Sequence, residues 1–237
     1  MFGLTHENWS NLTRALDDYK HLGYRTDLAC PWDALSSTIA VTLPETASPT
    51  VTLDGRSLVG SAEQRMLEWA LDGEHLNVRM AVLTPCFRWQ DNTPATGHHP
   101  YFAKVELGMF KRCDDFGTRL AIIREARRDA WSMLYDAKGA MRRVLGCTPD
   151  EVSPDEVSPV EEYLSHERAG GWLFEWHLSD LQINGVEVGS YGSRLWVPNS
   201  AHLPRHLAAE LGGIVWAYGT GLAEPRATFA KNYKTGR

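Results

Sequence analysis

The dipeptide Asn184-Gly185 separates two strand-like segments, 172–183 and 186–188, and this hairpin signal restricts the possible folds more than any other feature. Asn-Gly is typical of a type I′ turn, which joins two antiparallel strands. Further strand-like segments, 78–82 and 102–110, are joined by a long loop, and no regular βαβ alternation follows. We therefore expect an α+β domain with an antiparallel β-sheet flanked by helices.

Three helical patterns occur before residue 150. Residues 7–22 have an apolar stripe and end before Gly23, a typical helix C-terminus. Ser61 and Gln64 form a capping-box pair that begins a helix ending near Gly73. The longest apolar periodicity, over 118–145, ends at Gly146. In addition, we expect a strand at 38–43 and a hairpin over 51–59 that turns at Asp54-Gly55.

Length and composition predict one soluble globular domain over residues 1–237. Hydrophobic residues make up 43% and charged residues 23%. The repeated DEVSP run makes 148–163 acidic and proline-bearing, so we expect a mobile surface loop there. No apolar run approaches the roughly 20 residues that span a bilayer. The first residues lack the pattern of a secretory signal, so we expect a cytoplasmic protein.

Charge and cysteine content exclude several classes of function. The net charge of −6 disfavours a general nucleic-acid binder. The four cysteines are scattered without a CxxC pair or histidines at matching spacings, so structural thiols are favoured over a zinc site. No GxxxxGK[ST] loop and no GxGxxG after an early strand is present, so any nucleotide site must be of another kind.

A first candidate cluster lies between Arg88 and Glu106. Alternation along the second strand places Phe102, Lys104 and Glu106 on one face, opposite an apolar face. The preceding strand supplies Arg88 and the loop supplies His98. Arginine, histidine and an aromatic ring are groups that bind a triphosphate and a purine. The alternative is a hairpin whose polar face meets solvent.

A second cluster lies in the predicted hairpin. A two-residue turn pairs Leu181 with Val188 and brings Gln182 opposite Glu187 on the other face. A carboxylate beside an amide could coordinate magnesium or hold an ammonium group. The run GSYG, which begins at Gly189, allows a ligand to approach the backbone closely. The alternative is a surface hairpin with a polar outer face.

A third cluster is the run YGTGLAEPR near the C-terminus. Gly219 and Gly221 follow an apolar strand and would permit tight packing against a flat ligand. Arg226 falls in the first turn of a short helix, where the helix dipole disfavours a positive charge. This arginine therefore has a position that points to binding rather than to helix stability.

Taken in order, these clusters resemble the signature motifs of class II aminoacyl-tRNA synthetases. The third resembles motif 3, in particular the seryl-type GSGLAxxR, matched by Gly219, Gly221, Leu222, Ala223 and Arg226. Residues 7–31 resemble motif 1, which is usually a dimer element, so the resemblance implies a homodimer.

The first cluster resembles motif 2, an FRxE-type strand followed by a loop and (R/H)xxxF. Phe87-Arg88, His98 and Phe102 match this pattern. The glutamate of FRxE is replaced by Gln90, and Asp91 beside it resembles an alanyl-type CxRxxD arrangement. The segment 183–194 (INGVEVGSYGSR) is similar to the synthetase strand that carries a metal- or substrate-binding acid before motif 3. It is also similar to the corresponding strand of ammonia-dependent asparagine synthetase.

The resemblance implies an ATP-dependent ligase that activates an amino acid or a similar carboxylate with ATP and Mg²⁺. The implied roles include stacking of Arg226 on adenine opposite Phe102. The implied site residues are as follows: catalytic, Arg88 and Arg226; ATP-binding, Arg88, Asp91, His98, Phe102, Gly219, Gly221 and Arg226; substrate-binding, Glu106, Gln182, Gly189 and Ser190; magnesium-binding, Glu187.

The acceptor of the activated group stays open between a tRNA end, a carrier protein, a protein amine and a small molecule. No anticodon-binding domain is recognisable in the sequence, which favours a specialised ligase over ordinary tRNA charging. An ammonia-dependent amidating ligase of the asparagine-synthetase type is one alternative. A non-catalytic synthetase paralogue that binds tRNA as a regulator is another, and coincidental motifs in an unrelated binding protein are a third.

Overall fold

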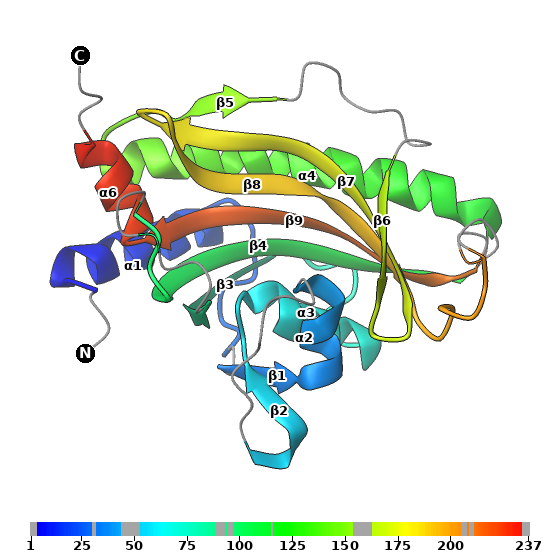
Figure 1. The fold of residues 1–237 in the computed structure, drawn as a ribbon. Coiled ribbons are helices and arrows are strands. Elements are labelled where there is room, and N and C mark those ends of the chain that lie inside the picture. Colours follow the sequence, from blue (N-terminus) through cyan, green and yellow to red (C-terminus); the bar gives the residue numbers. More distant parts are fainter. Residues whose placement is uncertain are drawn as a thin grey trace.

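The computed structural model describes residues 4–29, 32–43, 53–88, 93, 97–114, 116–153, 163–204, 208 and 211–233. Its centre is an antiparallel seven-stranded sheet in the order β3-β4-β9-β8-β7-β5, with β6 paired to β7 beside β5 (Figure 1). The strands are β3 (Met80–Phe87), β4 (Tyr101–Cys113), β5 (Asp150–Val152), β6 (Leu164–Arg168), β7 (Gly171–Ile183), β8 (Val186–Val197) and β9 (Gly213–Glu224). This architecture confirms the predicted α+β fold with an antiparallel sheet.

Helices cover both faces of this sheet (Figure 1). On one face lie α1 (His6–His21) and the long α4 (Phe116–Leu145). On the other lie α2 (Ser36–Thr42) and α3 (Ala62–Leu71), with the 3-10 turn η1 (Leu53–Gly55) and a small sheet of β1 (Asp33–Leu35) and β2 (Arg56–Leu58). The last helix, α6 (Arg226–Asn232), directly follows β9.

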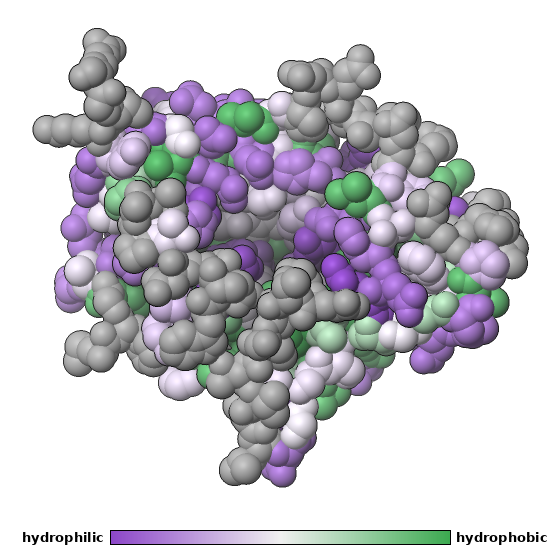
Figure 2. Space-filling view, viewed as in Figure 1, coloured by the Kyte–Doolittle hydropathy of each residue, from purple (hydrophilic) through white to green (hydrophobic). Residues whose placement is uncertain are grey.

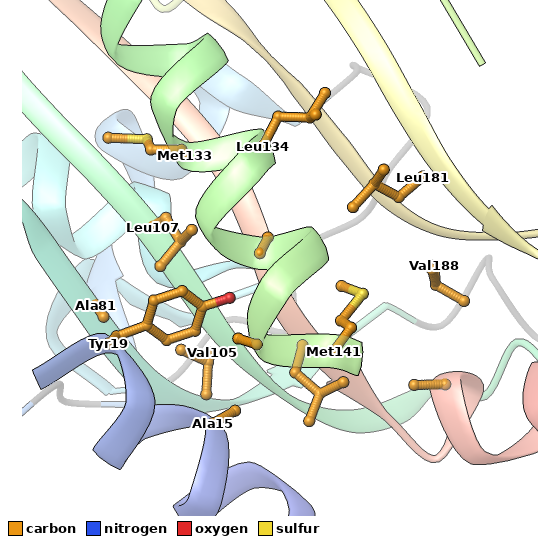
Figure 3. Close-up of a cluster of buried hydrophobic side chains, with 14 of the residues drawn as sticks. Ala15, Tyr19, Ala81, Val105, Leu107, Met133, Leu134, Met141, Leu181 and Val188 are labelled. Atoms are coloured by element: carbon orange, nitrogen blue, oxygen red, sulfur yellow. The ribbon is translucent and has the colours of Figure 1, made fainter. Parts of the chain in front are cut away.

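The main hydrophobic core lies between the sheet and the α1–α4 layer (Figure 3). Val105 and Leu107 of β4 point into it, where they meet Tyr19 of α1 and Met133 of α4. Because side chains alternate along a strand, Lys104 and Glu106 of β4 face the other side of the sheet. The alternation predicted for this strand is thus confirmed.

Local capping signals in the sequence correspond to the observed helix ends. Ser61 caps α3 in a capping box with Gln64, as predicted. Gly23, Gly73 and Gly146 follow α1, α3 and α4 and have positive φ angles of 85°, 82° and 75°. Glycine is favoured in this conformation because it has no Cβ.

Two local predictions are wrong. Residues 38–43 do not form a strand, because the segment that includes Thr38 folds into α2 and buries Ile39 and Val41. Leu181 pairs with Gly189 rather than with Val188, because the ladder shifts register at this point. Gln182 opposite Glu187 is confirmed, and Ile183 lies opposite Val186 next to the turn.

Two further predictions are tested only in part. In the expected hairpin 51–59, Asp54 and Gly55 do form a turn with positive φ angles. The strand after this turn, β2, pairs with β1, and residues 44–52 lie outside the described part of the chain. Within the expected loop 148–163, Asp150–Val152 form β5 and pair with β7. Residues 154–162 of that loop lie outside the described residues.

Cys86, Cys113 and Cys147 are free thiols, and the first two are buried. Among the described residues, none of the helices combines the length and the apolar character that crossing a membrane requires.

Candidate functional site

A cavity of about 420 Å³ opens on the face of the sheet that carries α3. Its walls come from β4, β8 and β9, from the start of α3, and from the start of α6. Figure 2 shows that this face is hollowed near its middle and that hydrophilic residues gather around the hollow. The volume lies within the roughly 300–1,000 Å³ typical of small-molecule sites.

The cavity brings together most of the residues that the sequence singled out, although they come from distant parts of the chain. All three candidate clusters contribute to it. The predicted site residues that line the cavity are Arg88, His98, Phe102, Glu106, Glu187, Gly189, Ser190 and Arg226.

Four predicted site residues are not among those lining residues. Gln182 lies opposite Glu187 in the ladder but does not reach the cavity wall. Gly219 and Gly221 face the helix layer on the other side of the sheet, where an added Cβ would meet the rings of tyrosines. Their lack of a side chain therefore serves packing of the sheet rather than close approach of a flat ligand. Asp91, like Gln90, lies outside the described residues.

Two arginines lie at one end of the cavity. Arg88 Nε donates to the carbonyl oxygen of Gly60 at 2.8 Å, and its guanidinium lies over the Phe102 ring, 5.6 Å from the centroid. Arg226 is the first residue of α6, and its Nη1 is 3.9 Å from Oε1 of Glu187. The expected stacking of Arg226 on adenine, on the side opposite Phe102, stays a prediction.

Glu187 is placed to bind a cation, and protons compete with that cation for its carboxylate. Burial raises the pKa of its carboxyl, although the positive charge of Arg226 acts in the opposite direction. Its side chain still keeps 44% of its surface exposed towards the cavity mouth. Magnesium commonly binds one or two carboxylates together with substrate phosphates and water, so this single carboxylate fits a Mg²⁺–nucleotide complex.

Glu106 lies deep in the cavity with its side chain 3% exposed. Lys104 Nζ is 2.8 Å from its Oε2, and the hydroxyl of Ser61 donates to the same oxygen. Ser61 is also the N-cap of α3, so the helix start and the strand hold this carboxylate from two sides. Glu106 is therefore a paired, fixed acceptor beneath the cavity.

A β-bulge in β9 determines which of its residues face the cavity. Val105 pairs with Leu222 but Glu106 pairs with Thr220, so Gly221 is the extra residue. Bulges re-aim side chains and are common beside active sites. Because of this one, Thr220 and Ala223 both face the cavity although they are three residues apart.

Two buried tyrosines fix the bulge from the opposite face. The hydroxyl of Tyr191 donates to the Thr220 carbonyl at 2.5 Å, and that of Tyr19 donates to the Gly221 carbonyl at 3.0 Å. Burial holds the pKa of both phenols well above the ordinary value, so they stay protonated donors. Tyr19 of α1 and Tyr191 of β8 thus hold the backbone path on which the cavity depends.

The helix that carries Arg226 is also fastened at both ends. Asn184, in the hairpin turn, donates to the Ala230 carbonyl at the end of α6, 2.9 Å away. The buried Glu224 before α6 accepts from Asn11 at 2.8 Å and from the hydroxyl of Thr228 at 2.8 Å. These contacts tie α6 to the hairpin and to α1, and so hold the position of Arg226.

The structure adds cavity residues that the sequence interpretation did not assign. They come from the capping motif, from the site face of β4, and from positions farther along β8 and β9: Ser61, Glu63, Lys104, Arg194, Tyr218 and Thr220. Strand alternation indicated Lys104, and the capping box indicated Ser61. No local pattern indicated Glu63 or Arg194, because their contacts join residues 131 positions apart.

By sequence, the chain matches no protein-family model and none of the curated proteins. By structure, it is similar to the cytoplasmic serine–tRNA ligase of Naegleria fowleri in complex with AMP (TM-score 0.57, 13% identity, 98% of this chain and 50% of that one). It is also similar to seryl-tRNA synthetase of Pyrococcus horikoshii complexed with ATP (TM-score 0.53, 13% identity, 94% and 49%).

Pyrrolysyl-tRNA synthetase of Desulfitobacterium hafniense has a similar fold as well (TM-score 0.51, 15% identity, 93% and 68%). The chain spans about half the length of the seryl enzymes that it matches. Identities this low support a common fold and a distant resemblance only. The chain therefore has the antiparallel α+β fold found in class II aminoacyl-tRNA synthetases such as the seryl and pyrrolysyl enzymes.

Proposed function

We propose that this protein is an ATP-dependent ligase that activates an amino acid as an acyl-adenylate. One observation carries the proposal: residues from three separate motif-like clusters, Arg88, Glu106, Glu187 and Arg226 among them, line the same cavity. Two proteins of similar fold were determined with AMP and with ATP, which supports nucleotide binding by this protein.

In the proposed reaction, an oxygen of the substrate carboxylate attacks the α-phosphorus of ATP. A new bond forms between carboxylate oxygen and phosphorus, the bond to the β-phosphate oxygen breaks, and pyrophosphate leaves. Arg88 would face the α-phosphate and stabilise the negative charge that develops there. Its Nε bond to Gly60 and its position over Phe102 orient the guanidinium before substrate binds.

Arg226 and His98 would hold the outer phosphates. Glu187, 3.9 Å from Arg226, would bind a magnesium ion that lowers the cost of charge build-up on the phosphates. Phe102 offers an aromatic surface for the base. Positioning and electrostatics suffice for this step, so no catalytic base is required.

Glu106 would receive the ammonium group of the amino acid. Both of its fixed contacts fall on Oε2, so an ammonium group in the cavity would bind through Oε1. Gly189 and Ser190 of β8 lie on the same cavity wall. The acceptor of the acyl group is open between a macromolecule and a small nucleophile.

ATP–pyrophosphate exchange with each common amino acid tests the proposal. We expect exchange with one or a few amino acids and a loss of roughly 10²–10³-fold in kcat when Arg88→Ala or Arg226→Ala removes a charge from the site. Arg112→Ala, at an exposed position on β4 outside the cavity, is the matched control and should keep its activity. Unchanged exchange in both cavity variants would show that the site is assigned incorrectly.

AMP release in the presence of ammonium, carrier protein or tRNA then identifies the acceptor. Release that depends on ammonium selects an amidating ligase. The similarity of α1 and the residues after it to motif 1 also supports a homodimer, which sedimentation equilibrium can test.

A further inference from the structure

The outer face of α4 carries a row of cations and aromatic rings that the proposed reaction does not use. Successive members of this basic row are three or four residues apart, which places them on one side of a helix. The row consists of Arg124, Arg128, Trp131, Tyr135, Lys138 and Arg142. By helix geometry, it stays within about 80° of arc over about 27 Å of α4. The helix itself extends along the sheet, on the side opposite the cavity (Figure 1).

The basic row faces away from the core. Leu134 of the same helix is fully buried beneath the sheet. By contrast, the three arginines of the row are exposed, and Tyr135 keeps 60% of its surface exposed. Trp131 and Lys138 are half-buried. The row is therefore accessible to a partner along its whole length.

No acidic residue interrupts the basic row. The three acids of α4 point about 100–140° away from the middle of the row around the helix axis. Lys111 Nζ of β4 is 3.1 Å from Oε2 of Glu125 and 2.7 Å from Oδ2 of Asp129. Arg79 Nη2 is 2.6 Å from Oδ2 of Asp136. Cations from outside α4 thus neutralise these acids, and the row has four formal positive charges with no acid of its own.

Two stacked aromatic rings lie in the middle of the row. The ring centroids of Trp131 and Tyr135 are 5.9 Å apart, and the ring planes are 21° from parallel. Tryptophan, tyrosine and arginine are enriched where proteins bind one another, with the rings at the centre of the interface and polar groups at its rim. The order of cations, rings and cations along α4 matches this arrangement.

We infer that the basic row of α4 is a docking surface for an acidic amphipathic helix of a partner protein. This inference is independent of the proposed function. Cations in line complement acidic side chains at the same spacing on a second helix, and the two rings complement apolar residues between those acids. A strip about 27 Å long and about 10 Å wide is smaller than a standard interface, so the contact is transient and sensitive to salt.

Shape and charge disfavour other anionic partners at this surface. Single-stranded nucleic acid is bound in positively charged grooves, whereas this row lies on the convex face of one helix in a chain with a net charge of −6. Binding to an anionic bilayer needs a broad apolar helix face, and the row contains no leucine, isoleucine or valine. A second copy that met the first through the same face would bring two rows of cations together.

A labelled helical peptide provides the test. The peptide repeats the spacing of the basic row on an alanine-rich background, with glutamates in place of the four cations and leucines in place of the two rings. A scrambled peptide of the same composition is its control. We expect saturable binding in fluorescence anisotropy at low salt, and weaker binding as salt rises, because salt screens exposed charges.

Variants at exposed positions locate the binding surface without disturbing the core. Reversing two charges together, Arg128→Glu with Arg142→Glu, should raise the Kd of the peptide at least about tenfold. Tyr135→Ala should raise it about tenfold, as expected for an aromatic residue at the centre of an interface. Arg112→Glu is the matched control, because Arg112 is exposed on the face of β4 opposite Lys111 and α4, and its Kd should stay within about twofold.

The possible outcomes decide between this inference and the other partners. The inference is overturned if the peptide shows no saturable binding, if the scrambled peptide binds equally well, or if the double variant and Arg112→Glu have the same Kd. Oligouridylate and phosphatidylglycerol vesicles are measured in the same way. Tighter binding of either one than of the peptide, lost in the double variant, would make the row a nucleic-acid or lipid surface and overturn the inference. Self-association in sedimentation that the double variant abolishes would overturn it as well.

Discussion

The hydroxyl groups of Tyr19 and Tyr191 provide the sharpest test of how the sheet maintains the cavity. Tyr191→Phe and Tyr19→Phe each remove one oxygen and keep the ring that fills the core. Each hydroxyl donates to a backbone carbonyl of the β9 bulge, those of Thr220 and Gly221. Both tyrosines are fully buried, so water cannot take the place of the lost donor.

The expected cost follows from leaving a buried carbonyl without this partner. Such a loss costs about 1–3 kcal/mol of unfolding free energy. For a chain of this size, 2 kcal/mol corresponds to a fall in Tm of about 4–8 °C. The two carbonyls belong to adjacent residues of one bulge, so we expect the double variant to deviate from additivity.

The same variants should also affect the site, because the bulge sets which residues of β9 face the cavity. A shift of about 1 Å in catalytic groups can cost on the order of 100-fold in rate. We therefore expect Tyr191→Phe to lower kcat in ATP–pyrophosphate exchange in addition to lowering stability. Measurements below the unfolding transition keep the two effects apart.

Tyr135→Phe is the matched control, since Tyr135 lies on α4 with 60% of its surface exposed. It should change the unfolding free energy by no more than about 0.5 kcal/mol in urea titrations. The reasoning is refuted if Tyr19→Phe and Tyr191→Phe unfold at the same urea concentration as Tyr135→Phe. Lower stability with unchanged kinetics would limit the role of the hydroxyls to folding.

Three further predictions concern packing, charge and pH. Gly219→Ala should lower the free energy of unfolding by about 1–3 kcal/mol, because the added Cβ would lie 2.6 Å from the Tyr191 ring. Gly139→Ala within α4 should raise the free energy of unfolding by about 0.5–1 kcal/mol. Urea titration compares the two variants. Arg194→Met should lower the free energy of unfolding by about 3–5 kcal/mol, since the substitution leaves the two carboxylate partners of Arg194 buried without their cation. A loss below about 1 kcal/mol in the same assay would contradict this prediction. Burial raises the pKa of Glu187, and only the ionised form of this residue binds a cation. Mg²⁺-dependent ATP binding, measured by calorimetry, should therefore strengthen as pH rises through a range above the usual glutamate pKa of about 4.3. Glu187→Gln should abolish this dependence on pH.

Short-range chemistry explains the parts of the fold that could be predicted. The Ser61 capping box, the Asn184-Gly185 turn and the strand alternation at Lys104 and Glu106 depend on neighbours within a few residues. The resemblance of the three clusters to class II synthetase motifs predicted a shared site. Arg88 of the first cluster and Arg226 of the third line one cavity.

Other features depend on contacts that a local pattern does not contain. Alternation over residues 38–43 places Ile39 and Val41 on one face, whereas in α2 they pack into two different clusters, and packing in the layer that contains α3 decides for the helix. The glycines of the third cluster are easily interpreted as ligand contacts. In the structure, Gly219 and Gly221 instead make room for the tyrosines beneath the sheet.

The sequence thus determines several helix ends, the hairpin turn and which side chains share a strand face, because capping, turn chemistry and alternation act over a few residues. Only the tertiary structure determines the register of the bulge at Gly221 and the ion pair of Glu63 with Arg194. Both arise where strands and helices from distant parts of the chain pack together. Their energies depend on burial and on distances across the sheet, which no local pattern encodes.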